Sequence, residues 1–275
     1  MKVEHSGRAS PERILAMLWR RSRPPGAGGK PALGRKPRLT LDEVVGAAIA
    51  LADAEGLAAV AMSRVATSLG VGTMTLYTYV RSKAELVDLM VDEVLNERAL
   101  PAPGAPRPPS WRAQVERFAQ QTRTMYRRHP WLRHISTIRP PVGPGMLAER
   151  EYVLSTLHGI GLTPQQMVTA ALAISAFVDA TASLEAESEG IERSTGQSHD
   201  AWWQERARLW EDYFDVDRYP TMTFVWKSGG FDKSSAEETA AAHEFGFQRL
   251  LDGIQSVIER QGETPRPLDR LPEGQ

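Results

Sequence analysis

The feature that most limits how this chain can fold is a short stretch in which two helical patterns flank the turn Leu69-Gly70-Val71-Gly72. Before the turn, apolar residues recur at helical spacing: Val65, Ala66 and Leu69. After the turn, Leu76 and Val80 recur with the same period. Gly70 can adopt the left-handed conformation that ends a helix. Because two short helices joined at such a turn form a helix-turn-helix, residues 60–86 predict that motif.

Longer helices are predicted on both sides of the motif. Thr40 and Glu43 have the spacing of a capping box, in which a hydroxyl and a carboxylate each bond to the other residue's backbone amide. Apolar residues follow at helical spacing up to Gly56, which supplies the stop. Ser82 and Glu85 have the same spacing and predict the start of another helix. No convincing alternating strand pattern is present, so the sequence predicts an all-α fold.

The second short helix carries an unusual number of hydroxyl groups: Thr73, Thr75, Tyr77, Thr78 and Tyr79. Threonine and tyrosine are poor helix formers, so an inert exposed helix would not favour them. On a helix that enters a major groove, hydroxyls can bond to phosphates and base edges, and threonine methyls can meet thymine methyls. The pattern alone fits a small helical hairpin with an incidentally polar face equally well.

Residues 40–98 resemble the DNA-binding domain of the TetR family of transcriptional regulators. The likeness lies in AEGL, RVATSLGVGTMTLYTYV and SKAEL at the family's spacing. The resemblance implies that the recognition helix, Thr73–Tyr79, presents Thr73, Met74, Thr75 and Thr78 to base edges. It also implies that Tyr77 and Tyr79, together with Lys83 at the start of the next helix, contact phosphates. It also implies that Ser63 and Arg64 reach the DNA backbone or flanking bases. Ala61 departs from the family, which often has a capping serine or threonine there, so the start of that helix is left open.

Residues 1–39 form a basic N-terminal extension. It has ten lysines and arginines against two glutamates, a net charge of +8, whereas the whole chain has a net charge of −1. This asymmetry suggests a polyanionic partner, although a solvated, disordered tail is the simpler reading of the charge alone. PERILAMLWRRSR within it could form a short amphipathic helix. Arg35, Lys36 and Arg38 are candidates for minor-groove contacts.

A proline-rich linker, residues 101–109, precedes a second helical domain at 111–260, and residues 261–275 read as a disordered tail. The second domain is similar to that of the tetracycline-repressor subgroup. This resemblance implies an all-helical domain that binds a ligand and forms the dimer interface. Two apolar stripes support this reading, the first comprising Met167, Ala170, Ile174, Phe177, Val178, Thr181 and Leu184, and the second Phe247, Leu250, Leu251, Ile254 and Ile258. The alternative is that both stripes face the chain's own core.

The second domain also contains candidates for an apolar effector pocket. They are Tyr126, Trp131, Met146, Phe177, Asp179 and Trp202. Ligand sites combine apolar and aromatic walls with a few polar groups, and Asp179 is the polar group of first interest because it lies on an otherwise apolar helix. It could equally lie at a subunit interface or in solvent. Most aromatic residues at helical spacing belong to a core.

Several functions are not expected. The chain has no cysteine, which excludes disulfides and thiolate metal sites and suits a reducing cytoplasm. Its six histidines do not have the spacing of a metal site, and neither a phosphate-binding loop nor a nucleophile elbow is present. No apolar run approaches the roughly 20 residues that span a bilayer, and no signal peptide is evident. We expect a cytoplasmic protein without cofactor or metal that is not an enzyme.

The sequence therefore predicts a homodimeric repressor that binds double-stranded DNA at a palindromic operator. A small apolar or aromatic effector is expected to release it. The alternative is a DNA-binding protein without ligand control, in an architectural or activating role. The sequence does not identify the effector, the operator or the regulated genes.

Overall fold

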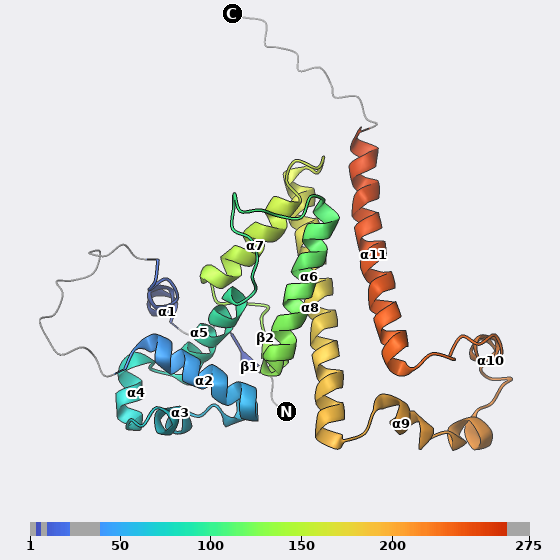
Figure 1. Cartoon of the computed structure of the whole chain (residues 1–275), viewed down its shortest axis with the longest axis horizontal. Coiled ribbons are helices and arrows are strands. Elements are labelled where there is room, and N and C mark those ends of the chain that lie inside the picture. The colour runs from blue at the N-terminus through green and yellow to red at the C-terminus, as the bar shows by residue number, and fades with distance from the viewer. Residues whose placement is uncertain (1–3, 7–9, 23–38, 263–275) are drawn as a thin grey trace, which may run out of the picture. The chain divides into compact units, whose positions relative to one another are not determined.

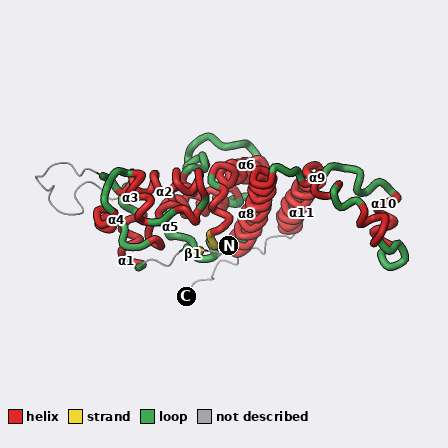
Figure 2. Tube along the Cα trace, turned by 90° about the horizontal axis from the view of Figure 1, so that it is seen from below, coloured by secondary structure: helices red, strands yellow, loops and turns green. Residues whose placement is uncertain are grey.

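Helices dominate the computed structural model, which describes residues 4–6, 10–22 and 39–262 (Figure 1, Figure 2). The elements are β1 (Glu4–His5), α1 (Pro11–Leu18), α2 (Leu41–Glu55), η1 (Leu57–Ala59), α3 (Met62–Ser68), α4 (Thr73–Tyr79), α5 (Lys83–Asn96), α6 (Trp111–Arg128), η2 (Pro130–His134), β2 (Ile135–Ser136), α7 (Pro144–Thr156), α8 (Pro164–Thr195), α9 (His199–Gln204), η3 (Leu209–Tyr213), α10 (Pro220–Lys227) and α11 (Ser235–Gly262). The all-α fold class is confirmed.

The described chain forms two compact units. Unit 1 contains the chain up to His158 together with Met167–Glu187, and unit 2 contains Gly159–Gln166 together with the chain from Ser188 onward. Helix α8 thus contributes residues to both. The two units do not divide at the proline-rich linker, residues 101–109. The domain bounds 40–98 and 111–260 therefore stay a prediction.

The predicted helix-turn-helix is present in unit 1 as α3 and α4. Thr40 and Glu43 form the expected capping box at the start of α2. Gly56 and Gly70 have φ angles of 83° and 65°, in the left-handed region. As expected, Gly56 ends α2, and Gly70 lies in the turn that follows α3. Helix α3 begins at Met62 after Ala61, which makes no side-chain capping bond, so the missing cap is real.

Only half of the second predicted capping box is formed. The Ser82 hydroxyl accepts from the Glu85 amide over 3.2 Å. The Glu85 carboxylate instead accepts from the Arg81 amide over 2.7 Å and pairs with the Arg13 guanidinium over 3.1 Å. Glu85 therefore fastens a distant helix to α5 and does not bond to the backbone of Ser82.

Part of the basic N-terminal extension is folded, which corrects the expectation of a solvated tail for residues 10–22. Helix α1 packs on α5 and buries Ile14 and Leu18. Arg20 and Arg21 then pair with carboxylates of α2 and α5: Arg20 lies 2.5 Å from Asp42, and Arg21 lies 2.9 Å from Glu93. Burial of apolar residues and local pairing outweigh the mutual repulsion of the arginines. The suggested minor-groove residues Arg35, Lys36 and Arg38 lie outside the described residues.

A two-residue strand pair was not expected. Strand β1 runs parallel to β2, with Glu4 opposite Ile135. The Ser6 hydroxyl extends this attachment by donating to the carbonyl oxygens of Ser136 and Arg139, each over 3.0 Å. Sequence patterns could not predict this pairing, since its two strands are far apart in the chain and each is too short to show alternation.

Helix α7 is held against α5 by a buried carboxylate. Asp92 of α5 accepts from the amides of Gly145 and Met146 in the first turn of α7, over 3.0 and 3.2 Å. Burial raises the pKa of Asp92 to about 6, although the two amide bonds favour its ionised form. A Cβ atom on Gly145 would lie 2.4 Å from the Asp92 carbonyl oxygen, so the close approach of the helices needs glycine.

The predicted apolar stripes are only partly buried. Buried members are Ile174 and Val178 of α8 and Phe247, Leu251 and Ile254 of α11. Leu184 of α8 is 58% exposed. By length and composition alone, α8 is the one helix among the described residues that could cross a membrane, a test that a core helix also passes. Asp179, which belongs to unit 1, interrupts the apolar residues of that helix.

Candidate nucleic-acid interface and ligand pocket

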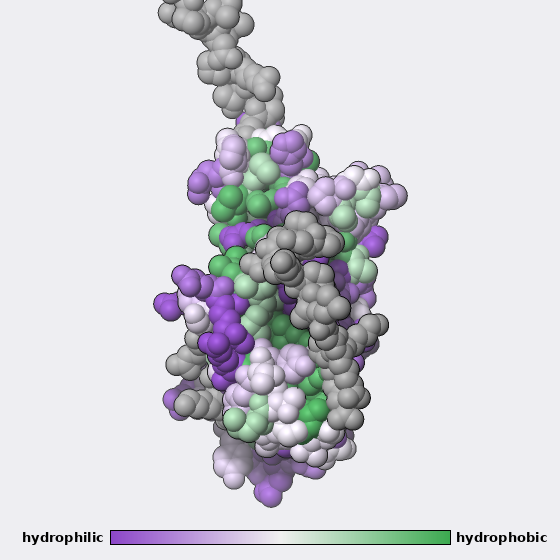
Figure 3. Space-filling model, turned by 90° about the vertical axis from the view of Figure 1, so that its left-hand side faces the viewer, coloured by the Kyte–Doolittle hydropathy of each residue, from purple (hydrophilic) through white to green (hydrophobic). Residues whose placement is uncertain are grey.

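Helix α4 presents its hydroxyl-bearing face to solvent. Met74 is 79% and Tyr77 41% exposed, and Thr75 and Thr78 are also exposed, whereas Leu76 is fully buried beneath them. In Figure 3, the part of the visible face where α3 and α4 lie is mostly pale, as expected for threonine, tyrosine and glycine. The geometry is that of a short helix anchored from behind and free to meet a partner.

The hydroxyl groups of α4 differ in how free they are. The Thr78 hydroxyl donates to the Thr75 carbonyl over 2.7 Å, and the Tyr79 hydroxyl donates to the Leu39 carbonyl over 2.8 Å. Tyr79 and Thr73 are half-buried. Tyr79 therefore joins α4 to the residue before α2, and its oxygen keeps only acceptor capacity. Thr75 and Tyr77 have the most accessible hydroxyls.

The cations predicted to contact DNA are paired within the chain. Arg64 lies on exposed α3 beside Ser63 and binds Glu55 over 2.7 Å. Lys83, in the first turn of α5, binds Glu4 over 2.7 Å. A phosphate would have to compete with these carboxylates. Because the Arg64–Glu55 pair is exposed and the Lys83–Glu4 pair is partly exposed, the competition costs little.

Sequence reasoning missed Arg81 as a candidate for phosphate contact. It directly precedes Ser82 between α4 and α5, is exposed, and has no side-chain partner among the described residues. Its position directly after the predicted recognition helix could have identified it from the sequence.

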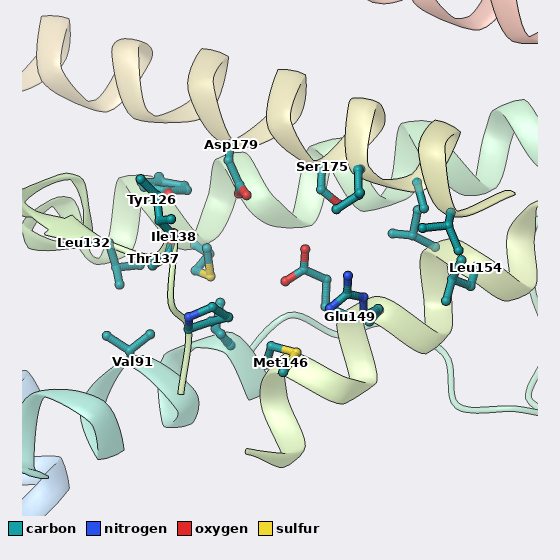
Figure 4. Close-up of a pocket in the computed structure, with 18 residues that line it drawn as sticks. Val91, Tyr126, Leu132, Thr137, Ile138, Met146, Glu149, Leu154, Ser175 and Asp179 are labelled. Carbon is teal, nitrogen blue, oxygen red and sulfur yellow. The ribbon is translucent and has the colours of Figure 1, made fainter. Parts of the chain in front are cut away.

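Unit 1 contains a cavity of about 330 Å³ lined by α5, α6, α7, α8 and the segment around β2 (Figure 4). The lining residues are Val91, Leu95, Met125, Tyr126, Leu132, Thr137, Ile138, Pro140, Met146, Glu149, Arg150, Val153, Leu154, Val168, Ala171, Leu172, Ser175 and Asp179. The wall is mainly apolar with a few polar groups, which is typical of small-molecule sites.

Three of the six ligand candidates from the sequence line this cavity, namely Tyr126, Met146 and Asp179. The other three do not. Trp131 is buried and donates from Nε1 to Asp53 over 2.7 Å, and Phe177 lies on α8 outside the lining. Trp202 belongs to α9 in unit 2, where the Arg206 guanidinium lies 3.9 Å from its ring centroid. Helical spacing cannot tell which face of a helix borders a cavity.

The polar side of the cavity holds two carboxylates that the sequence did not pair. Asp179 of α8 and Glu149 of α7 point into the cavity from opposite walls (Figure 4). Glu149 binds the buried Arg98 over 2.5 Å. Burial, together with the charge of Glu149, raises the pKa of Asp179 to about 7. Burial and the nearby Asp179 carboxylate also raise the pKa of Tyr126 well above its usual range.

A buried histidine connects the DNA-binding helices to the helices of the cavity. His129, which ends α6, bonds through Nδ1 to Asp53 of α2 over 2.8 Å and through Nε2 to Glu97, which ends α5, over 3.0 Å. Trp131 donates to the same Asp53 oxygen. Three elements of unit 1 therefore meet at one imidazole ring.

Two family models match the chain. The model described as "Bacterial regulatory proteins, tetR family" matches residues 44–90, and "Tetracyclin repressor-like, C-terminal domain" matches residues 103–258. The chain is 38% identical over 267 residues to the HTH-type transcriptional repressor DrrR1 of Streptomyces coeruleorubidus, which covers 95% of this chain and 92% of that protein. It is 24% identical over 233 residues to the tetracycline repressor protein class E of Escherichia coli, over 83% of this chain and 96% of that protein.

Solved structures agree with these relatives. Apo ActR from Streptomyces coelicolor is similar with a TM-score of 0.65 and 26% identity, over 82% of this chain and 99% of that one. ActR in complex with actinorhodin is similar with a TM-score of 0.64 and 26% identity, over 81% and 99%. The two family models match in the expected order, and DrrR1 is similar to this chain along nearly its full length. Both findings point to the same family. The chain belongs to the TetR family of transcriptional regulators.

Proposed function

We propose that this regulator represses transcription by binding a palindromic operator as a homodimer and that a small apolar or aromatic effector releases it. The observation that carries the proposal is the exposed face of α4 above the fully buried Leu76. Thr73, Met74, Thr75 and Thr78 would meet base edges. Tyr77, Tyr79, Arg81 and Lys83 on α4 and at the start of α5, and Ser63 and Arg64 on α3, would meet the phosphate backbone.

The cavity supports control by an effector. Val91 and Leu95 of α5 line it, and α5 begins at Lys83, directly after the recognition helix. A ligand that shifts α5 would therefore shift α4 relative to the DNA. To reverse DNA binding almost completely, the ligand must prefer the released state by about 10⁴-fold. A DNA-binding protein without ligand control would have no use for such a cavity, and the similar ActR has been solved with actinorhodin.

Exposed apolar side chains support dimerisation. They include Val168, Leu172, Leu184 and Ile191 of α8 and Trp203, Phe224, Trp226 and Phe245 of unit 2. Soluble monomers rarely leave so many large apolar side chains in water, and a second copy of the chain would cover them. A dimer also supplies the two recognition helices that a palindrome needs, about one helical turn apart.

Selection of bound DNA from random sequence, at two salt concentrations, tests the proposal. We expect palindromic sites whose half-sites are separated by about one turn of DNA. Thr75→Ala should relax the preference at one position of each half-site, at a cost of about 1–3 kcal/mol for the preferred base. Thr124→Ala, which removes an exposed threonine from α6, is the matched control and should leave the preference unchanged. Recovery of only non-specific, steeply salt-dependent binding would refute the proposal.

A further inference from the structure

The geometry points to an effector that carries a protonated amine on an apolar ring system, with the amine held between Asp179 and Glu149. This inference rests on the proposed function, because it names the chemical class of the effector that the same cavity takes. It concerns two carboxylates in a wall that is mainly apolar.

Asp179 is the first step in the argument. Its side chain is half-buried on α8 and points into the cavity (Figure 4). Within the part of the chain that the structure describes, its carboxylate forms no hydrogen bond and no ion pair, and the nearby charge of Arg98 only partly favours its ionised form. Burying a charged carboxylate without a partner is costly, and burial accordingly raises the pKa of Asp179 to about 7. A ligand that donates hydrogen bonds would supply the missing partner.

The other charged groups near the cavity do not meet this need. The side chain of Arg98 is fully buried and is already engaged by Glu149, the Leu95 carbonyl and the Thr122 hydroxyl. Arg150 also lines the cavity but is exposed, so water screens its charge. The one ion pair of Arg98 among the described residues is with Glu149, so the Asp179 carboxylate is left without an ion-pair partner and the interior of the cavity favours a cation.

The rest of the wall sets the size and character of the ligand's body. Leu95, Met125, Ile138, Val153 and Leu172 offer apolar surface to a ring system, and about 330 Å³ accommodates two or three fused rings. An ammonium group on such a body would form charge-assisted hydrogen bonds to the carboxylates while the rings bury apolar surface. An anionic group on the same body would meet two like charges.

Three fluorescent probes with one ring system and different charges test this inference. They are 9-(methylaminomethyl)anthracene as the cation, 9-anthracenemethanol as the neutral ligand and 9-anthracenecarboxylate as the anion. Binding to the full chain is measured by fluorescence titration at pH 8, where Asp179 is mostly ionised. We expect the cation to bind at least about tenfold more tightly than the alcohol, and the anion to bind most weakly.

Asp179→Asn separates charge recognition from the pocket itself. The variant keeps the side chain's size, so it should bind the alcohol as the unmodified chain does but lose most of the preference for the cation. Asp217→Asn, which changes an exposed aspartate of unit 2, is the matched control. It should change neither the affinity for the alcohol nor the preference for the cation. Equal binding of cation and alcohol, or an unchanged cation preference in Asp179→Asn, would overturn the inference and leave the proposed function standing. If no probe binds at about 1 mM, the inference is overturned as well, whereas the proposed function is tested separately by the selection of bound DNA.

Discussion

At the scale of single residues, the chain's own carboxylates occupy the positions where DNA phosphates are expected. Lys83 lies in the first turn of α5, where free amides and a cation together favour an anion. The anion present is Glu4, 2.7 Å away, which the β1–β2 pairing holds in place. If Lys83 contacts the proposed operator, the N-terminal strand would therefore compete with the DNA for this lysine.

Glu4→Gln should strengthen operator binding. Removing the carboxylate frees Lys83, and an exposed ion pair of this kind is worth up to about 1 kcal/mol, so we expect up to a fivefold gain in affinity. The slope of log K against log salt should steepen by about 1, because one more phosphate is neutralised. Fluorescence anisotropy with the selected operator over a salt series measures both. Glu12→Gln removes the same charge from the exposed side of α1, and a gain as large as that of Glu4→Gln would contradict the prediction.

At the scale of elements, the sequence predicted the helix boundaries that depend on bonds within a single turn. Thr40, Gly56 and Gly70 act within their own turns, so their spacing was enough to place α2, α3 and α4. The docking of α1, the β1–β2 pair and the meeting of Glu149 with Asp179 depend on contacts between distant segments. Periodicity carries no information on those contacts, which is why only Tyr126, Met146 and Asp179 of the six pocket candidates line the cavity.

Gly145→Ala should loosen the docking of α7 on α5. The added Cβ would lie 2.4 Å from the Asp92 carbonyl oxygen and 3.0 Å from the Asn96 amide nitrogen, both backbone atoms that can move only with α5. We expect the free energy of unfolding to fall by about 2–3 kcal/mol, as measured by chemical denaturation. Gly46→Ala in α2 is the matched control, since its Cβ meets no atom within 4 Å, and it should raise stability by up to about 1 kcal/mol. Equal effects of the two substitutions would refute the close approach.

At the scale of the whole molecule, the proposed switch needs a connection between the α4 surface and the cavity. Helix α5 provides one route, because it begins beside α4 and lines the cavity. His129 provides a second route. It lies at the end of α6 and bonds to Asp53 of α2 and to Glu97 at the end of α5. The two routes share α5, so a change in its position reaches α2 and α4 together.

The His129 connection should depend on pH. Burial disfavours the imidazolium, but the hydrogen bonds to Asp53 and Glu97 outweigh burial and raise the pKa of His129 above its ordinary value of 6.5. Because the folded-state pKa is raised, the protonated histidine contributes its full stabilisation below pH 6.5. That contribution is lost as pH rises through the raised pKa.

His129→Gln should therefore lower the free energy of unfolding by about 2 kcal/mol at pH 6, with a smaller loss at pH 9. Chemical denaturation of both proteins at several pH values measures the difference. His158→Gln removes an exposed histidine and should give no such trend. A loss for His129→Gln that is the same at pH 6 and pH 9 would show that the ring acts through its shape and not its charge. The His129 contact between α2, α5 and α6 would then have no proton dependence.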